Sequence, residues 1–158
     1  MSSLKESPNK YPLPPILTVG MLILCYLLDT FLPLGWEPEQ VTGFMRSAGL
    51  LLIVVALALD VWAFLTFRKH KANMMPHKPA THLLTSGPFA HSRNPIYLAD
   101  ILILLGVSLW TGSIVGFLSV PVFFLILERR FIRPEENRLE EAFGEDFRRY
   151  KSETRRWL

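Results

Sequence analysis

Cysteine is almost absent from this 158-residue sequence, since Cys25 is its only one and lies inside a long apolar run. A single cysteine excludes an intramolecular disulfide and a cysteine-based metal framework. The four histidines show neither HExxH nor clustered HxxHH spacing, so we expect no metal centre. GxGxxG and Walker motifs are also missing, which argues against a nucleotide-type cofactor held on a Rossmann or P-loop turn.

Apolar residues are abundant and come in long runs. Half of the residues are hydrophobic and the mean hydropathy is +0.27, which is too apolar for an ordinary soluble domain. Four runs cover 14–34, 43–67, 96–110 and 113–127. A membrane-spanning helix needs about 20 apolar residues; the first two runs reach that length, and the last two reach it when extended toward 94 and 132. The sequence predicts an all-α, polytopic membrane protein with about four transmembrane helices, the last two forming a hairpin turned at Thr111-Gly112.

Positive charge gathers on one side of the predicted membrane. Of the 17 Lys and Arg residues, two precede the first run, five lie within 68–93 and nine follow from 129 onward. Arg46 alone falls on the opposite side, where we expect it to pair with Asp29. Basic residues prefer the cytoplasmic side, so both termini and the loop before the third run are expected there. This basic face suits anionic membrane lipids, and no recognition motif accompanies it that would indicate nucleic acid binding.

One membrane domain is expected over 1–158, with a polar tail at 1–13 and the first two transmembrane helices at 14–67. The remaining part, 68–158, holds a loop, the hairpin and a C-terminal segment. From Pro134 to Leu158, apolar residues recur at spacings of three and four opposite a charged face. This pattern predicts an amphipathic cytoplasmic helix. It is either a surface anchor on the headgroups or, given the acidic pair at 135–136 in its first turn, a carboxylate-bearing wall of a membrane pocket.

The polar stretch at 82–97 reads HLLTSGPFAHSRNPIY and separates the two hydrophobic halves. Gly87, followed by proline, breaks regular structure. Asn94 before Pro95 fits a helix start, with the Asn side chain as its cap. Free N–H groups, the positive helix end and Arg93 together suit a carboxylate or another anion. The alternative is an interfacial loop in which Arg93 meets lipid phosphates.

Two carboxylates are predicted inside the membrane. Asp60 and Asp100 each lie about 10 Å from the cytoplasmic boundary, given the rise per residue of a helix. Ionisable groups at that depth are costly and usually face a cavity or a partner. Their matching depth favours a polar pocket that opens to the cytoplasm. The alternative is that each pairs with an arginine, such as Arg129 or Arg130.

Several motifs of the second half agree in order and spacing with one known family. They are a GPF turn at 87–89, the RNPIY helix start at 93–97, the EE pair at 135–136, FGEDF at 143–147, Tyr150 and the terminal RRW. Together they resemble the isoprenylcysteine carboxyl methyltransferase family, which belongs with the wider phospholipid methyltransferase-like membrane enzymes. The resemblance covers about residues 76–158, and the first two helices match by hydropathy only. It implies a membrane methyltransferase that binds S-adenosylmethionine without a Rossmann fold, in a pocket closed by the C-terminal segment, while a lipophilic acceptor enters from the bilayer.

Carried over by position, the resemblance implies cofactor contacts at Leu83, Leu84, Phe89, Asn94, Pro95, Ile96, Tyr97 and Glu135. The same motifs add four more cofactor-binding candidates, His82, Gly87, Arg93 and Glu136. The family often has His at the position of Asn94 and Tyr at that of Phe89; Asn still offers hydrogen bonds and Phe still offers a stacking face. The family's substrate-facing arginine matches Phe131, which Arg130 and Arg133 flank, so these two arginines are the predicted substrate-orienting residues.

The acceptor is expected to be a lipophilic acid. Methyl transfer from a sulfonium needs mainly positioning and exclusion of water. A carboxylate is already a nucleophile, and the sequence offers no convincing base, so carboxyl methylation of isoprenylcysteine or a similar acid is favoured. A phospholipid or small-molecule N- or S-methyltransferase of the same fold is an alternative. So are an NADPH-dependent sterol-type membrane reductase, with its comparable R-x-P-x-Y helix start, and a non-catalytic membrane scaffold. The EE…FG spacing favours the methyltransferase.

Overall fold

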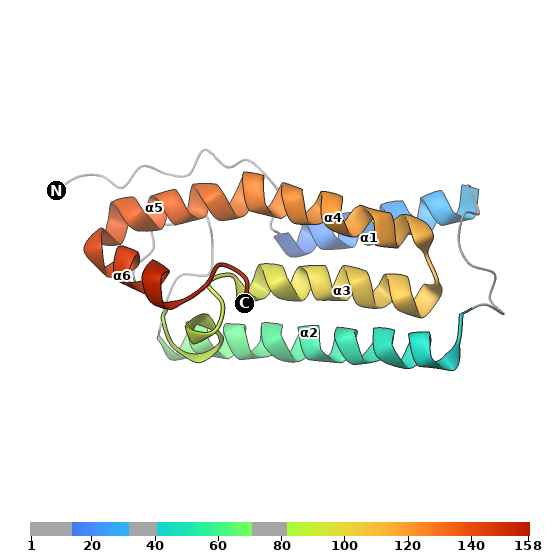
Figure 1. Cartoon of the computed structure of the whole chain (residues 1–158), viewed down its shortest axis with the longest axis horizontal. Helices are drawn as coiled ribbons and strands as arrows, with labels where there is room; N and C mark the ends of the chain where they lie inside the picture. The colour runs from blue at the N-terminus through green and yellow to red at the C-terminus, as the bar shows by residue number, and fades with distance from the viewer. Residues whose placement is uncertain (1–13, 32–40, 71–81) are drawn as a thin grey trace.

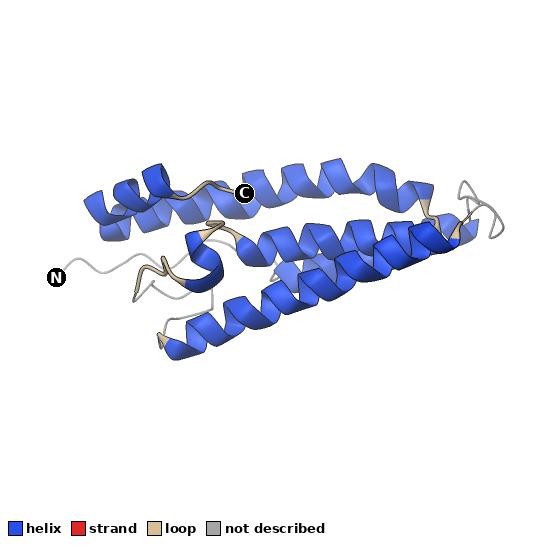
Figure 2. Cartoon of the chain, turned by 60° about the horizontal axis from the view of Figure 1, so that its bottom comes forward, coloured by secondary structure: helices blue, strands red, loops and turns tan. Residues whose placement is uncertain are grey.

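The computed structural model describes residues 14–31, 41–70 and 82–158, and every regular element in these ranges is a helix (Figure 2). The elements are α1 (Pro14–Phe31), α2 (Gly43–Lys69), η1 (Gly87–Ala90), α3 (Pro95–Thr111), α4 (Ile114–Leu127), η2 (Glu128–Ile132), α5 (Arg133–Phe143) and α6 (Glu145–Glu153). The predicted tail at 1–13 lies outside the described residues. The predicted all-α class is confirmed for the part of the chain that the structure describes.

Two helices are long and apolar enough to cross a membrane, α1 with 18 residues and α2 with 27. Large apolar side chains are exposed along them, including Tyr26 and Leu51, and along α4 at Leu118. Exposed apolar surface of this extent is typical of a membrane-facing protein. The α3 and α4 helices have 17 and 14 residues. The expectation of four membrane spans therefore stays a prediction.

Helix α3 lies between α2 on one side and α1 with α4 on the other (Figure 1). Two glycines allow α2 and α3 to approach closely. A Cβ atom on Gly49 would lie 2.5 Å from the carbonyl oxygen of Gly106, and one on Gly106 would lie 2.8 Å from that of Gly49. Ala56 and Ala63 continue this buried face of α2. Small residues at such positions let two helix backbones pack directly.

The hairpin turn between α3 and α4 lies at Gly112, as predicted. Gly112 ends α3 with a φ of 74°, a conformation that favours glycine. Ser113 caps α4, and its hydroxyl accepts from the Gly116 N–H at 2.7 Å. The core between α1, α3 and α4 is then filled by Leu104 and Phe123, both fully buried.

Helix α4 continues into α5 through η2, a wider helical turn. The Arg133 N–H donates to the carbonyl oxygen of Glu128, five residues earlier. Pro134 follows, and its missing N–H removes the ordinary donor for a carbonyl four residues back, which favours such a local widening. Turns of this kind are frequent at functional sites.

The prediction of one C-terminal helix over 134–158 is wrong. Gly144 has a φ of 51° and separates α5 from α6. The positive φ favours glycine and ends the helix, so the chain reverses and α6 returns toward the start of α3 (Figure 1). After Glu153 the chain leaves the helix, and residues 154–157, here called the C-terminal tail, continue in that direction.

Candidate functional site

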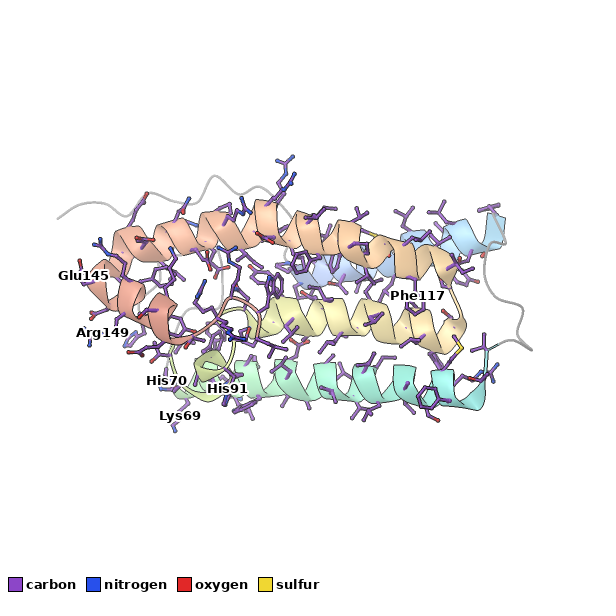
Figure 3. All side chains as sticks on the ribbon, viewed as in Figure 1. Lys69, His70, His91, Phe117, Glu145 and Arg149 are labelled. Atoms are coloured by element: carbon purple, nitrogen blue, oxygen red, sulfur yellow. The ribbon has the colours of Figure 1, made fainter. Side chains whose placement is uncertain are left out.

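Polar side chains gather at one end of the helix bundle. Figure 3 shows Lys69, His70, His91, Glu145 and Arg149 at this end, whereas Phe117 lies in the other half. The loop at 82–94, the start of α3, the start of α5 and the C-terminal tail meet here. This end holds most of the residues that the sequence predicted as a site.

The loop at 82–94 is packed against the end of α2. Gly87 has a φ of 63°, and a Cβ atom there would lie 2.7 Å from Thr66 Oγ1, so only glycine fits this approach. The buried Phe89 ring meets Phe67 edge-on, with 5.4 Å between ring centroids. Leu84 joins Phe89 and Ala63 in a small apolar cluster. The loop is therefore held by close packing, and it places an apolar surface beside the start of α3.

Helix α3 begins at Pro95 with Asn94 at the cap position, as predicted, but the predicted capping bond is wrong. The Asn94 side chain makes no capping bond to the helix. Its Nδ2 instead donates to the carbonyl oxygen of Arg156 at 3.0 Å. The Asn94 N–H donates to Ser92 Oγ at 3.1 Å. Asn94 thus connects the helix start to the C-terminal tail.

The C-terminal tail lies across this helix start. The Arg93 N–H donates to the carbonyl oxygen of Arg155 at 3.0 Å, and its guanidinium donates to the carbonyl oxygens of Lys151 and Thr154. Trp157 stacks on Phe124 of α4, with 4.8 Å between ring centroids and 29° between planes. The tail is thereby attached to both the loop and α4.

Glu136 is the centre of an ion-pair network. Its Oε1 accepts from Arg93 Nη2 at 2.8 Å, and its Oε2 accepts from Arg156 Nη2 at 2.6 Å. The side chains of Arg93 and Glu136 are each 9% exposed. Burial raises the pKa of Glu136, but the hydrogen bonds from Arg156 and Arg93 outweigh it and hold the pKa below its ordinary value. The anion that Arg93 binds here is thus a carboxylate of the same chain.

Glu135 points to a different partner. The Tyr97 hydroxyl donates to Glu135 Oε2 at 2.7 Å, which joins the start of α3 to the start of α5 across 38 residues of sequence. Removal of water from the Glu135 carboxylate raises its pKa, and the bond from Tyr97 lowers it by less. The RNPIY and EE motifs therefore meet in space.

The remaining predicted site residues divide into two groups. Pro95 is buried, Ile96 packs against the cluster of Leu84 and Phe89, Leu83 is half-buried and His82 is exposed. Of the predicted substrate-orienting residues, Arg130 is exposed, and Arg133 is 59% exposed and pairs with Glu128 Oε1 at 2.8 Å, an oxygen that Arg156 of the Glu136 network also reaches at 3.2 Å. The geometry alone does not test whether these residues bind a cofactor or a substrate, so these roles stay predictions.

Sequence reasoning missed two contributors. Arg156 holds Glu136, and the Tyr150 hydroxyl donates to the carbonyl oxygen of Phe89 at 2.6 Å. Both contacts depend on the chain reversal at Gly144, which places residues far apart in sequence beside each other. The family pattern includes Tyr150 and the RRW motif, so it could have drawn attention to both residues. It did not indicate which residues they contact.

These features define a class: an all-helical protein, over the residues described, with two helices long and apolar enough to cross a membrane and a polar site at one end, formed by its loop, helix starts and tail. The phospholipid methyltransferase family model matches residues 44–146, from α2 into α6. The chain belongs to this family, which is part of the isoprenylcysteine carboxyl methyltransferase-like group. The resemblance seen in the sequence is confirmed.

Three relatives are similar to parts of the chain. An uncharacterized protein of Haemophilus influenzae is 44% identical over 63 residues, which are 40% of this chain and 100% of that protein. The cobalt-zinc-cadmium resistance protein CzcN of Cupriavidus metallidurans is 28% identical over 110 residues, 70% of this chain and 47% of CzcN. The nickel-cobalt-cadmium resistance protein NccN of Alcaligenes xylosoxydans xylosoxydans is 24% identical over 110 residues, 70% of this chain and 48% of NccN. The chain thus spans about half the length of these two resistance proteins, and no solved structure matches it.

Proposed function

We propose that this chain is a single-domain integral membrane methyltransferase that takes a methyl group from S-adenosylmethionine and transfers it to a lipophilic acceptor. The observation that carries the proposal is the hydrogen bond of 2.7 Å between Tyr97 and Glu135. It joins the two family motifs that the resemblance assigns to the cofactor. Membership of a methyltransferase family supports the reaction class.

The residues at the polar end fit such a cofactor. A desolvated carboxylate at Glu135 suits ribose hydroxyls or an α-amino group. Beside it, Leu84 and Phe89 supply the apolar and aromatic surface that an adenine ring favours. When bound, the cofactor supplies a methyl group on a sulfonium. Arg93 and Glu136 contribute by holding the C-terminal tail over the loop, which excludes water from the site.

Two acceptor classes are proposed. The family resemblance favours the carboxylate of isoprenylcysteine or a similar lipophilic acid, which the guanidinium groups of Arg130 and Arg133 would orient. The second class is a phospholipid amine or another protonated nucleophile. A buried carboxylate oxygen on each of α2 and α3, without a hydrogen-bond partner, favours this second class.

Glu135→Gln is expected to weaken binding of S-adenosylhomocysteine by roughly 10- to 100-fold, because a hydrogen bond to a charged group contributes about 1.5–3 kcal/mol. The amide oxygen of Gln can still accept from the Tyr97 hydroxyl, so the variant should stay folded. Calorimetry on the detergent-purified protein measures the affinity. Glu141→Gln, on the exposed side of α5, is the matched control and should bind normally.

Normal affinity in the Glu135→Gln variant would remove Glu135 from the site. NADPH is titrated separately in the same samples. Binding of NADPH alone would support a sterol-type reductase, and binding of neither ligand to folded protein would support a membrane scaffold.

We also propose four membrane spans with both termini and the polar end in the cytoplasm. In a Cys25→Ser background, a cysteine at exposed Glu153 should react with a membrane-impermeant maleimide in inverted vesicles and not in right-side-out ones. Gly43→Cys, at the other end of α2, should show the reverse pattern. Labelling of both positions from the same side would contradict this orientation.

A further inference from the structure

Two acidic residues on the packed helices α2 and α3 each have a buried carboxylate oxygen. Asp100 of α3 is 3% exposed; its Oδ1 accepts from Thr18 Oγ1 of α1 at 2.8 Å, and its Oδ2 is buried with no hydrogen-bond partner. Asp60 of α2 is half-buried, and its Oδ1 is also buried without a partner. Carboxylate oxygens from two helices thus lie within the protein with unused acceptor capacity.

Neither carboxylate has a cationic partner among residues 14–31, 41–70 and 82–158. The ion pairs of these residues do not include Asp60 or Asp100, so the alternative that they pair with Arg129 or Arg130 is wrong. The negative charge of Asp60 acts on Asp100 instead, and like charges disfavour each other. Within the part of the chain that the structure describes, the two carboxylates therefore have no positive charge paired with them.

A third carboxylate with a buried oxygen supplies a comparison. Asp29, near the other end of α1, has a buried Oδ1 without a hydrogen-bond partner, and the predicted ion pair with Arg46 is not formed. Asp29 is half-buried like Asp60, and it lies eleven residues beyond Thr18 on α1, about 16 Å along the helix, so it is outside the group formed by Asp60, Asp100 and Thr18. It is therefore a matched control for the pair.

The pair lies next to the proposed methyltransferase site. Asp100 follows Tyr97 by three residues on α3, so the two side chains share one helix face about one turn apart. The charge of Asp100 acts on the Tyr97 hydroxyl, which in turn donates to Glu135. A group bound between the carboxylates would therefore lie beside the proposed cofactor contacts.

We propose that Asp60 and Asp100, with the Thr18 hydroxyl, form a binding site for a cationic group of ammonium size between α1, α2 and α3. Uncompensated charges in an apolar interior are costly, and ionisable residues in membrane helices are typically kept for a partner. Two sources share this chemistry. One is the protonated amine of a lipophilic acceptor, which rests on the proposed methyltransferase function; the other is a free monovalent cation, Na⁺ or K⁺, which does not.

An amine acceptor would also need to lose a proton before methylation, and the pair can accept it. The N–H bond of the ammonium group breaks and an O–H bond forms at Asp100 Oδ2, leaving a neutral amine and a neutral carboxyl group. This supplies the base that the sequence alone did not reveal. A carboxylate acceptor, in contrast, would be repelled by the two aspartates.

The test is calorimetry on the full chain in phosphatidylcholine nanodiscs, with empty discs subtracted. Dodecylamine is the cationic probe and dodecanoic acid is the anionic control, both in buffer free of Na⁺ and K⁺. Saturable binding of dodecylamine, weakened at least about tenfold in Asp100→Asn and in Asp60→Asn, is expected from the loss of a buried charge partner. Asp29→Asn should bind like the wild type. Na⁺ and K⁺ are titrated in separate samples.

Binding of dodecylamine with this variant pattern supports the acceptor amine as the source, and binding of Na⁺ or K⁺ with the same pattern supports the free ion. The proposal is overturned if the folded wild type binds neither dodecylamine nor a monovalent cation, or if Asp29→Asn weakens binding as much as the other two substitutions do. S-adenosylhomocysteine is titrated in the same discs. Intact cofactor binding without cation binding overturns this inference alone, whereas cation binding without cofactor binding overturns the methyltransferase proposal alone. If Asp100→Asn fails to fold, the titrations of Asp60→Asn and of the wild type test the proposal.

Discussion

Glu136→Gln is expected to destabilise the folded chain by about 3 kcal/mol, because breaking a buried ion pair leaves its partner charges uncompensated. Arg93 would lose the carboxylate at 2.8 Å and Arg156 the one at 2.6 Å. In a chain of this length, such a loss lowers the midpoint of thermal unfolding by roughly 6–12 °C. Circular dichroism of the purified protein measures it, and trypsin cleavage within the C-terminal tail should become faster.

The pH dependence of this effect has a defined sign. The folded-state pKa of Glu136 is below its ordinary value, so its stabilisation is fully present above the ordinary glutamate range. The stabilisation declines as the pH falls through the lowered pKa. The difference between wild type and Glu136→Gln should therefore shrink in acid and stay constant near neutral pH.

Glu145→Gln is the control for this experiment. It removes an ion pair with Arg148 in which the side chains are 83% and 57% exposed. Exposed pairs contribute about 0–1 kcal/mol. Equal losses in the two variants would show that the Glu136 network does not hold the tail in place.

Gly49→Ala is expected to lower the free energy of unfolding by about 2 kcal/mol through overpacking. The added Cβ would lie 2.5 Å from the Gly106 carbonyl oxygen and 2.7 Å from the Trp110 backbone nitrogen. Both are backbone atoms that cannot rotate away, so α2 and α3 must separate. This cost exceeds the roughly 1 kcal/mol by which alanine favours a helix over glycine.

Gly20→Ala provides the comparison, since no atom lies within 4 Å of a Cβ placed there on α1. This variant should be at least as stable as the wild type. Denaturant titration of both variants in the same detergent gives the two differences. A Gly49→Ala protein as stable as Gly20→Ala would mean that α2 and α3 do not pack through their glycines.

Much of the helix layout follows from local sequence rules. The predicted first helix from Pro14, the start of α3 after Asn94 and the hairpin at Gly112 agree with the structure. Hydropathy, proline at a first helical position and glycine after a last one act within a few residues, so they can be read along the chain. The recognised family motifs likewise singled out the RNPIY and EE stretches. The prediction of one C-terminal helix failed because the apolar spacing continues past Gly144. Periodicity does not reveal the positive φ of Gly144, which ends α5 there.

The partners of the charged groups were decided by tertiary structure. The sequence selected Arg93 and Glu136 as site residues, yet their mutual pairing spans 43 residues and depends on how α5 packs against the start of α3. The bond between Thr18 and Asp100 spans 82 residues and depends on α1 packing on α3. A carboxylate acquires its role from whichever donor or charge the packing places within about 3 Å, and that distance is set by helices that are remote in sequence.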